Sequence, residues 1–314
     1  MIMELKHFLS ITDLDTAAMK RIFTMAATLK HSESYKTALA GNTMVMLFEK
    51  PSLRTRVSFE VGMTQLGGHA VYLGPDDIGL GTRESVSDVA KVASSMGDVM
   101  MARVFSHSTI YELAKHSRVP VINGLSDWEH PCQALADLFT ILEVKKKLGG
   151  LKIAFIGDGE NNIAHSLVLA SAQWGMNICI ASPKGYEVKS EILLMAQNIS
   201  IQSGGNVFLT DDPQEAVRGA DVVYTDTWVS MGDEADKSTR LCKFLPYQVN
   251  SWLMSLAKRD AVFMHDLPAY RGQEVTADVI DGAQSIVFHQ AENRLHVQKA
   301  LMLWLLGCYH GKSV

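Results

Sequence analysis

Short apolar runs alternate with helical patterns along this chain, and that alternation constrains its fold more than any other feature. The apolar runs predict strands at residues 43–48, 70–73, 99–103, 120–123, 151–156, 177–181, 206–209, 221–224 and 261–264. The other patterns predict helices at residues 14–31, 52–66, 84–95, 110–116, 133–148, 163–174, 190–199, 213–218 and 292–309. Because strands that alternate with helices form parallel βαβ units, the sequence predicts an α/β fold with parallel sheets.

The alternation runs in two series. The long predicted helix 133–148 stops at Gly149-Gly150, a strong helix-end signal, and a new strand follows at once. A chain of 314 residues is also long enough for about two domains. We therefore expect two doubly wound parallel-sheet domains, residues 1–149 and 150–291, linked by the two long helices 133–148 and 292–309.

The composition disfavours several classes of partner. Hydrophobic residues make up 47% of the chain and charged residues 20%, so a folded core is expected. The net charge of −5 disfavours nucleic acid, which needs a basic surface. The most apolar stretch, residues 300–308, is far shorter than the roughly 20 residues of a membrane span. The cysteines at 132, 179, 242 and 308 lack metal-site spacing and, like the short charged N-terminal segment, suit a cytoplasmic protein.

The segment FEKPSLRTRVSFE, residues 48–60, leaves a predicted strand and opens a helix. Ser52 is a good N-cap, and the free backbone N–H groups at a helix start favour an anion. Arg54 and Thr55 fall in the first turn, where they can add charged and hydroxyl donors. The alternative for this segment is a capped helix with solvated arginines. Arg56 faces another side of the helix, and we expect it to form a structural ion pair.

Two further groups fall at the same predicted rim of the sheet. Arg103 ends the strand 99–103, and His130-Pro-Cys-Gln133 precedes the long helix. Ligands of α/β sheets gather at the carboxyl ends of the strands, so these side chains are expected near the helix that starts at Ser52. His130 is then a candidate donor to a carbonyl oxygen, although a lone histidine is more often structural.

A glycine-rich turn, Gly157-Asp-Gly-Glu-Asn-Asn162, follows the strand 151–156 and superficially resembles a dinucleotide-binding loop. Asn162 stands where that pattern has its third glycine, and the acidic residue expected about 20 positions later is missing. A nicotinamide cofactor is therefore disfavoured. The plain alternative for Asn162 is an asparagine at a helix start.

Polar residues also follow the last two predicted strands. Asp226 lies just after the strand 221–224, where a carboxylate can hold an ammonium group or cap a turn. His265-Asp266-Leu267-Pro268 follows the strand 261–264. The polar segment 227–240 is long for a connection in a compact domain, and loops of that length are often functional.

Five segments together resemble the aspartate/ornithine carbamoyltransferase family: FEKPSLRTRVSFE, HPCQ, DTWVSMGDEAD, HDLPAYRGQEV and ENRLHVQKALM. They occur in this order over nearly the whole chain, and Ser230-Met231-Gly232 is similar to the ornithine branch in particular. The resemblance implies a carbamoyl phosphate-binding domain at residues 1–149, with residues 292–314 packing back on it, and an ornithine-binding domain at residues 150–291. It also implies a homotrimer that needs no cofactor and no metal.

The resemblance also assigns site residues. For carbamoyl phosphate it implies Ser52, Leu53, Arg54, Thr55, Arg103, His130, Gln133 and Arg294, and for ornithine Asn162, Asp226, Ser230, Met231, Asp266 and Leu267. Among these, Thr55, Arg103 and His130 would donate hydrogen bonds to the carbonyl oxygen. Gln133 would hold the carbamoyl amide, and Asp266 would act on the amine. The polar loop at 227–240 would close over ornithine.

The implied reaction transfers the carbamoyl group of carbamoyl phosphate to L-ornithine, which gives L-citrulline and phosphate and belongs to arginine metabolism. The attacking group must be the neutral amine, so activity is expected to rise towards alkaline pH. Three alternatives stay open at this point. They are a relative that uses putrescine, N-acetylornithine or aspartate as acceptor, a non-catalytic amino-acid or phosphate sensor, and a dehydrogenase.

Two positions depart from the family pattern. Family members commonly carry cysteine at the position of Asp266, and many ornithine enzymes carry a glutamine near Gly79 that reaches a neighbouring subunit. The carboxylate of Asp266 could hold the α-ammonium together with Asp226, or it could accept the proton of the δ-amine. Gly79 cannot take over the role of the glutamine, because it has no side chain.

Overall fold

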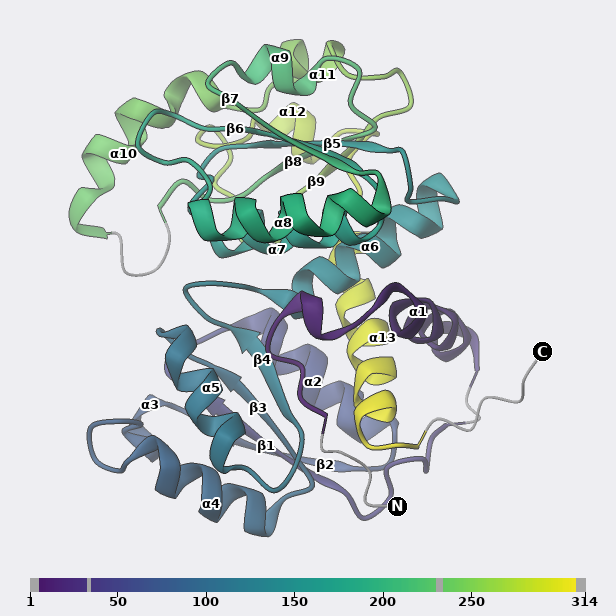
Figure 1. Ribbon diagram of the computed structural model, residues 1–314, viewed down its shortest axis with the longest axis vertical. Coiled ribbons are helices and arrows are strands. Elements are labelled where there is room, and N and C mark those ends of the chain that lie inside the picture. Colours follow the sequence, from purple (N-terminus) through teal and green to yellow (C-terminus); the bar gives the residue numbers. More distant parts are fainter. Residues whose placement is uncertain (1–5, 33–34, 230–233, 309–314) are drawn as a thin grey trace. The chain divides into compact units, whose positions relative to one another are not determined.

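The computed structural model describes residues 6–32, 35–229 and 234–308 of the chain (Figure 1). The chain divides into two compact units. Unit 1 comprises residues 1–139 and 292–314, and unit 2 comprises residues 140–291. Both boundaries lie inside long helices, α6 (Pro131–Lys145) and α13 (Val287–Leu305). The first boundary therefore lies ahead of Gly149-Gly150, where the sequence pattern restarts.

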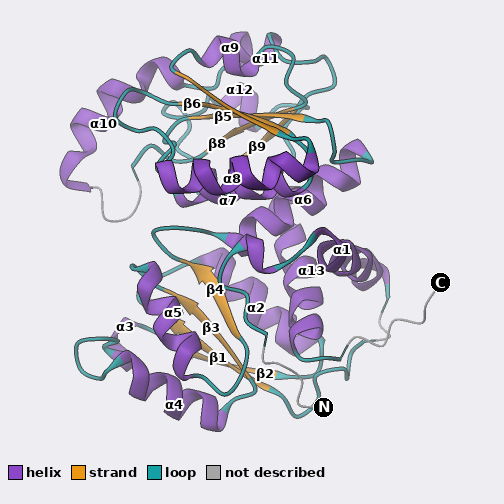
Figure 2. Ribbon diagram, viewed as in Figure 1, coloured by secondary structure: helices purple, strands orange, loops and turns teal. Residues whose placement is uncertain are grey.

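Unit 1 is built on a parallel sheet of four strands in the order β2-β1-β3-β4 (Figure 2). The strands are β1 (Thr43–Phe48), β2 (His69–Leu73), β3 (Val99–Arg103) and β4 (Val121–Leu125). The helices are α1 (Thr16–His31), α2 (Leu53–Gln65), α3 (Pro75–Ile78), α4 (Val86–Met96) and α5 (His107–His116), with a 3-10 turn η1 at Ile11–Asp13. The pairing of Phe48 with Arg103 brings the carboxyl ends of β1 and β3 together, close to where α2 begins.

Helices cover both faces of this sheet. On one face, Leu47 and Ala102 of the sheet belong to an apolar core with Ala90 of α4 and Leu113 of α5. On the other side of the unit, α2 and α13 approach each other closely at Gly62, where an added Cβ atom would lie 3.1 Å from Met302 Cε. This close helix pair is what allows a side chain of α13 to reach the start of α2.

Unit 2 is built on a parallel sheet of five strands in the order β7-β6-β5-β8-β9. The strands are β5 (Lys152–Ile156), β6 (Asn177–Ala181), β7 (Asn206–Thr210), β8 (Val222–Thr225) and β9 (Val262–Met264). The helices are α7 (Asn162–Gln173), α8 (Ser190–Ser203), α9 (Pro213–Val217), α10 (Lys237–Phe244), α11 (Ser251–Ser255) and α12 (Ala277–Ile280), with 3-10 turns η2 at Glu234–Asp236 and η3 at Leu245–Tyr247.

The direction of the strand order in unit 2 reverses at β5, which has the later strand β8 on one side and β6 on the other. Helices α7 and α8 lie on one face of the sheet, and α9, α11 and α12 lie on the other (Figure 1). In open α/β sheets, ligands bind outside the carboxyl ends of the strands at such a switch point. The connections after β5, β8 and β9 are therefore the natural place for a ligand in this unit.

The α/β fold class and the two parallel sheets are as the sequence predicts. Each of the nine predicted strands is present, with bounds that differ from the prediction by no more than two residues. Buried parallel strands appear in a sequence as apolar runs, which is why most of these segments were easy to place, although the edge strands β2 and β7 are exposed or half-buried.

The helix ends are less well predicted. Helix α6 ends at Lys145 rather than at Leu148, because Lys146 takes a left-handed conformation with φ of 62°. Helix α8 continues to Ser203 and stops at Gly204, whose φ is 81°. Helix α13 begins at Val287, earlier than the predicted residue 292.

The predicted polar loop at 227–240 is wrong in its second half. Residues 234–236 form η2, and α10 begins at Lys237. The sequence of α10, KSTRLCKF, is polar on average, and its buried face carries Arg240 as well as Phe244, so the helix was missed. Residues 230–233, with Ser230 and Met231, lie outside the described part of the chain.

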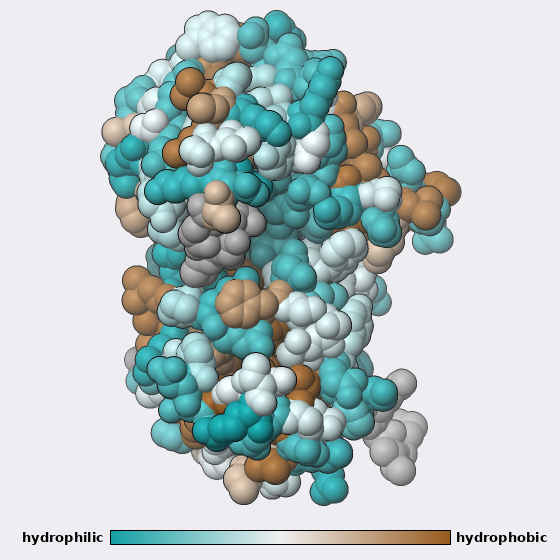
Figure 3. Space-filling model, turned by 90° about the vertical axis from the view of Figure 1, so that its left-hand side faces the viewer, coloured by the Kyte–Doolittle hydropathy of each residue, from teal (hydrophilic) through white to brown (hydrophobic). Residues whose placement is uncertain are grey.

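The surface in Figure 3 is mostly hydrophilic, with apolar side chains in small separate groups. Among the described residues, every helix is too short or too polar to cross a membrane.

Candidate functional site

The start of α2 forms the first polar cluster, which lies in unit 1. Ser52 is the N-cap of this helix, and its Oγ accepts a hydrogen bond from the backbone N–H of Thr55 at 3.3 Å. The helix is 13 residues long, so its first N–H groups and its dipole give this end a partial positive charge. The arrangement suits an anion such as a phosphate group.

Two buried arginines converge on Thr55. Arg103 Nη1 and Arg294 Nη2 each donate a hydrogen bond to Thr55 Oγ1 at 3.4 Å. Arg294 Nη1 also donates to Gln133 Oε1 at 2.5 Å, and Gln133 Nε2 donates to Asp137 Oδ1 at 2.8 Å. Arg103 is 7% exposed and Arg294 is 2% exposed. Residues of β3, α2, α6 and α13 thus place two guanidinium groups around one hydroxyl group.

His130 lies in the electrostatic field of three arginines. Burial lowers the pKa of His130 well below its usual value, and the charges of Arg294, Arg103 and Arg54 lower it further. The imidazole is therefore neutral near pH 7, and one of its nitrogens carries a hydrogen that can be donated. A neutral donor among fixed positive charges suits a carbonyl oxygen on which negative charge develops.

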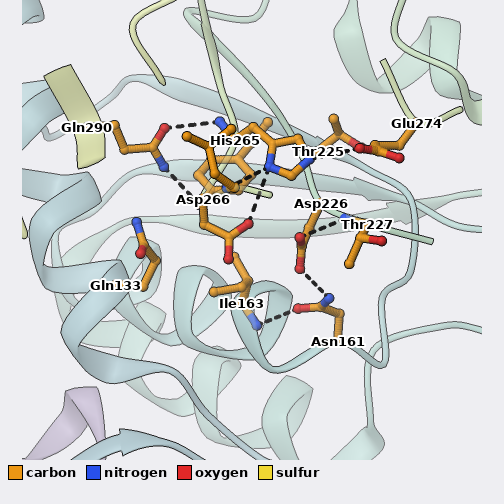
Figure 4. Close-up of polar contacts among 12 residues, drawn as sticks. Gln133, Asn161, Ile163, Thr225, Asp226, Thr227, His265, Asp266, Glu274 and Gln290 are labelled. Carbon is orange, nitrogen blue, oxygen red and sulfur yellow. Dashed lines mark hydrogen bonds and ion pairs between the residues drawn. The ribbon is translucent and has the colours of Figure 1, made fainter. Parts of the chain in front are cut away.

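The second polar cluster lies in unit 2, at the carboxyl ends of β5, β8 and β9 (Figure 4). Asn161 is the N-cap of α7, and its Oδ1 accepts from the backbone N–H of Ile163 at 2.6 Å. Its Nδ2 donates to Asp226 Oδ2 at 2.6 Å. Asp226 Oδ1 accepts from the backbone N–H of Thr227, also at 2.6 Å. Both oxygens of this buried carboxyl group are therefore held in place.

His265 connects Asp266 to Glu274 and is fully buried (Figure 4). His265 Nδ1 accepts the backbone N–H of Leu267 at 2.9 Å, so the ring hydrogen lies on Nε2 and is donated to Glu274 Oε1 at 3.2 Å. Nδ1 also lies 3.4 Å from Asp266 Oδ1. Burial lowers the pKa of His265, but the interactions with Asp266 and Glu274 outweigh burial and raise it. Nδ1 therefore faces both a donor, the backbone N–H of Leu267, and an acceptor, Asp266 Oδ1, so the neutral ring bonds to the first and the protonated ring to the second.

Asp226 and Asp266 behave as a pair. Burial raises the pKa of Asp226 well above its ordinary value, and the charge of Asp266 and a hydrogen bond to it raise it further, while His265 lowers it. Two carboxyl groups in such close contact do not both ionise readily near neutral pH, so the pair holds one proton. The pair can bind a cationic group and can exchange a proton with it.

The same residues offer ligand types that a metal ion could use. Among the described residues, the side-chain ligand atoms of Asp226, His265 and Asp266 lie within 4.8 Å of one another. Backbone and amide N–H groups already donate to both oxygens of Asp226 and to His265 Nδ1. These contacts describe a hydrogen-bond network, and a metal is not needed to explain it.

Comparison of the sequence with known protein families gives two matches, one for each half of the chain. Residues 6–143 match the domain described as "Aspartate/ornithine carbamoyltransferase, carbamoyl-P binding domain". Residues 149–305 match the domain described as "Aspartate/ornithine carbamoyltransferase, Asp/Orn binding domain". The chain belongs to the aspartate/ornithine carbamoyltransferase family.

Similar proteins include the ornithine carbamoyltransferases of Anoxybacillus flavithermus and Bacillus subtilis. The first is 52% identical over 305 residues, which is 96% of each chain. The second is 53% identical over 308 residues, 98% of this chain and 95% of the relative. Among solved structures, ornithine carbamoyltransferase from Pyrococcus furiosus has a TM-score of 0.93 at 47% identity, covering 96% of this chain and 97% of its own. The anabolic enzyme from Campylobacter jejuni has a TM-score of 0.91 at 42% identity, covering 96% and 98%.

The structure brings together the carbamoyltransferase residues that the sequence assigns to unit 1. Thr55, Arg103, Gln133 and Arg294 are joined by hydrogen bonds, while Arg54 and His130 are linked by their electrostatic interaction. Ser52 and Leu53 begin α2. The sequence placed Arg294 early in its helix. In the structure it lies about two turns inside α13, because that helix begins at Val287.

The residues assigned to unit 2 are brought together only in part. Asp226 and Asp266 are paired, and Leu267 follows them with a left-handed backbone, φ 62°. Asn162 is the first residue of α7, but the amide that contacts Asp226 belongs to its neighbour Asn161.

Sequence reasoning missed four residues of this network: Asn161, His265, Glu274 and Gln290. Gln290 Oε1 accepts the backbone N–H of His265 at 3.0 Å, and its Nε2 donates to the hydroxyl of Tyr224 at 3.0 Å. For His265 and Glu274 the sequence did offer a signal, because both belong to the same HDLPAYRGQEV segment as Asp266. Gln290 carried no such signal.

The structure accounts for two other sequence observations. Arg56 forms the expected ion pair, with Glu60 Oε2 at 3.0 Å. Gly79 follows α3 with a left-handed backbone, φ 53°, and an added Cβ atom would lie 2.9 Å from Arg83 Cβ. A residue with a side chain at Gly79 would therefore be strained.

Proposed function

We propose that this protein is an ornithine carbamoyltransferase, which transfers the carbamoyl group of carbamoyl phosphate to L-ornithine and releases L-citrulline and phosphate. One observation carries the proposal: two buried guanidinium groups converge on Thr55 at the start of α2, beside a neutral His130. This is the environment that a phosphorylated carbonyl compound needs. The names of the similar proteins supply the acceptor, ornithine.

In this proposal, unit 1 binds carbamoyl phosphate. The first N–H groups of α2, with Ser52, Leu53 and Arg54, hold the phosphate group. Thr55, Arg103 and His130 donate hydrogen bonds to the carbonyl oxygen. Gln133 and Arg294 of the same unit supply two further contacts.

Gln133 Oε1 already accepts one hydrogen bond from Arg294, and its second lone pair is available to the carbamoyl amide. Arg294 also donates to Thr55, so it fixes the positions of both residues.

Unit 2 binds ornithine through Asn162, Asp226, Ser230, Met231, Asp266 and Leu267. The Asp226–Asp266 pair carries net negative charge and attracts the amino groups of ornithine. Asn162, at the N-terminus of the 12-residue helix α7, faces the α-carboxylate, which the helix dipole favours.

The reaction is then an acyl transfer. The neutral δ-amine attacks the carbonyl carbon, a C–N bond forms, and negative charge grows on the oxygen held by Thr55, Arg103 and His130. The C–O bond to phosphate breaks, and Arg54 with the start of α2 stabilises the charge on the leaving phosphate. The proton lost by the amine passes to the phosphate or to the solvent. The carboxyl pair next to the amine can accept this proton transiently.

A test with several amines addresses the proposed acceptor. Purified protein with carbamoyl phosphate should form citrulline from ornithine with a kcat/KM at least about 100-fold above that for putrescine, N-acetylornithine or aspartate, which is about 2.7 kcal/mol of discrimination. Faster turnover of another amine would identify a different member of the family. Tight binding of carbamoyl phosphate without turnover of any of the four amines would point to a sensor.

Replacing Asp266 by cysteine tests which part of ornithine it serves. We expect Asp266→Cys to raise the KM for ornithine by about tenfold and to leave kcat within about threefold, because one hydrogen-bond acceptor is lost while Asp226, relieved of the charge of Asp266, still supplies a carboxylate. Asp266→Asn keeps the shape of the side chain and removes its charge, so it serves as the control that separates a change of shape from a loss of charge. A large fall in kcat would show that Asp266 instead accepts the proton of the δ-amine. If neither parameter changed, Asp266 would have no part in the reaction.

We also propose that the protein works as a homotrimer in the cytoplasm, within arginine metabolism. The apolar side chains of Leu53, Val57 and Val61 recur every four residues along α2 and are 73%, 48% and 37% exposed. A second copy of the chain would cover this stripe, beside the start of α2 where phosphate is expected to bind. Sedimentation equilibrium should give a mass three times that of the chain.

A further inference from the structure

Arg240 is not among the residues assigned to either substrate, yet its side chain is buried and contacts two separate segments of unit 2. It lies in α10, and its Nε donates to the backbone carbonyl oxygen of Trp228 at 2.6 Å. Its Nη2 donates to Asp158 Oδ2. The guanidinium group also lies 4.9 Å from the centre of the Tyr186 ring and 5.4 Å from that of Phe244. A buried arginine held on all sides in this way is a fixed part of the structure.

The two hydrogen-bond partners of Arg240 belong to the two chain segments that the hydrogen bond between Asn161 and Asp226 joins. Asp158 lies in the turn between β5 and α7, and its Oδ1 accepts the backbone N–H of Glu160 at 3.0 Å. That turn leads directly to Asn161, whose amide contacts Asp226. Trp228, the second partner, is two residues beyond Asp226 in the chain. One guanidinium group therefore connects the segment that carries Asp226 with the turn that carries its partner.

We propose that Arg240 and Asp158 form a clamp that positions Asp226 and Asn161 for the binding of ornithine. Arg240 is then a positioning residue for the second substrate and does not touch it. This inference rests on the proposed function. It goes beyond that function because neither the ornithine-binding set nor the reaction requires a buried arginine in α10.

The electrostatics of the clamp argue against a role in stability alone. Burial raises the pKa of Asp158 to about 6, even though Arg240 lowers it. An acid whose pKa is higher in the folded chain loses stability as pH rises through the interval from its ordinary value to its folded value. The pair is half ionised near pH 6 and fully formed only well above it, where that loss is complete. A buried ion pair that costs stability is better explained by the geometry that it imposes.

The other charged groups around the clamp do not reverse the upward shift of the Asp158 pKa. Glu160, in the same turn, raises the pKa of Asp158, and its own carboxylate pairs with Lys189 at the start of α8. On the side of α10, the ammonium group of Lys243 lies 4.9 Å from the centre of the Tyr186 ring. Asp158 therefore depends on Arg240 as its direct cationic partner.

The first test compares Arg240→Lys with Arg271→Lys. Lysine keeps the charge but cannot hold Trp228 and Asp158 at once, because it lacks the planar fork of donors. Arg271 is a matched control, since it forms a two-point ion pair with Asp281, at 2.9 and 2.6 Å, on the exposed surface of the same unit. We expect Arg240→Lys to raise the KM for ornithine at least about tenfold, with kcat within about threefold and the Kd of carbamoyl phosphate, from calorimetry, within about twofold. Arg271→Lys should change none of these.

Hydrogen exchange supplies a measurement that does not depend on turnover. In Arg240→Lys, peptides covering residues 157–163 and 224–229 should exchange faster than in the wild type, while the strands β6 and β7 keep their protection. An unchanged rate in both peptides would overturn the clamp. So would an ornithine KM within about twofold of the wild-type value, or an equal rise in the control.

A double variant covers the case in which Arg240→Lys does not fold. Asp158→Asn combined with Arg240→Met removes both charges, so at pH 8 its melting temperature should be no lower than that of the wild type, while its ornithine KM rises as in the single variant. A normal ornithine KM in the double variant would contradict the clamp. A wild-type protein that forms no citrulline would instead overturn the proposed function, and the exchange experiment would still decide whether the clamp exists.

Discussion

Replacement of Arg54 by alanine should reduce kcat/KM by about 10³-fold, or roughly 4 kcal/mol of transition-state stabilisation. Arg54 lies in the first turn of α2, and its charge acts on the buried imidazole of His130 together with those of Arg103 and Arg294. As phosphate leaves, its negative charge grows, and a charge-assisted contact is worth more at that moment than in the bound substrate. Steady-state kinetics with both substrates varied is the measurement.

Arg56 offers a matched control on the same helix. It is exposed and pairs with Glu60 at 3.0 Å, an interaction of the kind that contributes only about 0.3–0.5 kcal/mol to stability. We expect Arg56→Ala to keep its kcat/KM within about threefold of the wild type, and both variants to keep the wild-type melting temperature within about 2 °C. If Arg54→Ala were as active as Arg56→Ala, Arg54 would not contact the phosphate.

The difference between these two neighbours was visible in the sequence, because it depends only on helix geometry. The nine strands were visible for a similarly local reason, since all but β4 contain at least three consecutive apolar residues. What the sequence could not show is where a helix ends when a residue other than glycine turns the chain. Lys146 does this after α6, although Gly149-Gly150 is the stronger signal.

The site in unit 2 shows a second limit. Asn161 and Asn162 are adjacent and chemically identical, and either could reach a ligand as far as the sequence shows. The structure makes Asn161 the N-cap, which directs its amide to Asp226. Arg240 was hidden for another reason: its partners Asp158 and Trp228 are distant in the sequence, and only the folded chain brings them together. Contacts of this kind carry no local pattern.

Replacement of Asp226 by asparagine should reduce kcat/KM for ornithine by about 10³-fold, roughly 4 kcal/mol, while the Kd of carbamoyl phosphate stays within about twofold. Asp226 accepts hydrogen bonds from Asn161 and Thr227, each at 2.6 Å. Asparagine has only one acceptor oxygen, so its NH₂ group would face either the amide of Asn161 or the N–H of Thr227. The variant therefore loses the fixed orientation of the site, together with a carboxyl group that can ionise when the cationic ornithine binds.

Asp221→Asn is the control for the general effect of replacing a buried aspartate next to β8. Asp221 is also buried, just before β8, where it accepts the backbone N–H of Lys152 at 2.8 Å and pairs with Lys258 at 2.7 Å. It lies at the opposite end of the strand, so its replacement should lower the melting temperature but keep the ornithine KM within about threefold. Equal losses of activity in the two variants would mean that Asp226 acts only through stability.

The pH dependence separates charge from shape in this pair. The charge of Asp266 raises the pKa of Asp226, so in Asp266→Asn the carboxyl group of Asp226 should ionise at a lower pH than in the wild type. In this proposal ornithine binding uses the charge of Asp226 itself, so the limb of the kcat/KM profile for ornithine that reports the ionisation of Asp226 should move to lower pH in this variant. In Asp226→Asn the low activity should persist across the whole range, because the geometry around Asn161 and Thr227 is lost at every pH. A profile of Asp266→Asn that overlays the wild-type profile would show that the two carboxyl groups do not share a proton.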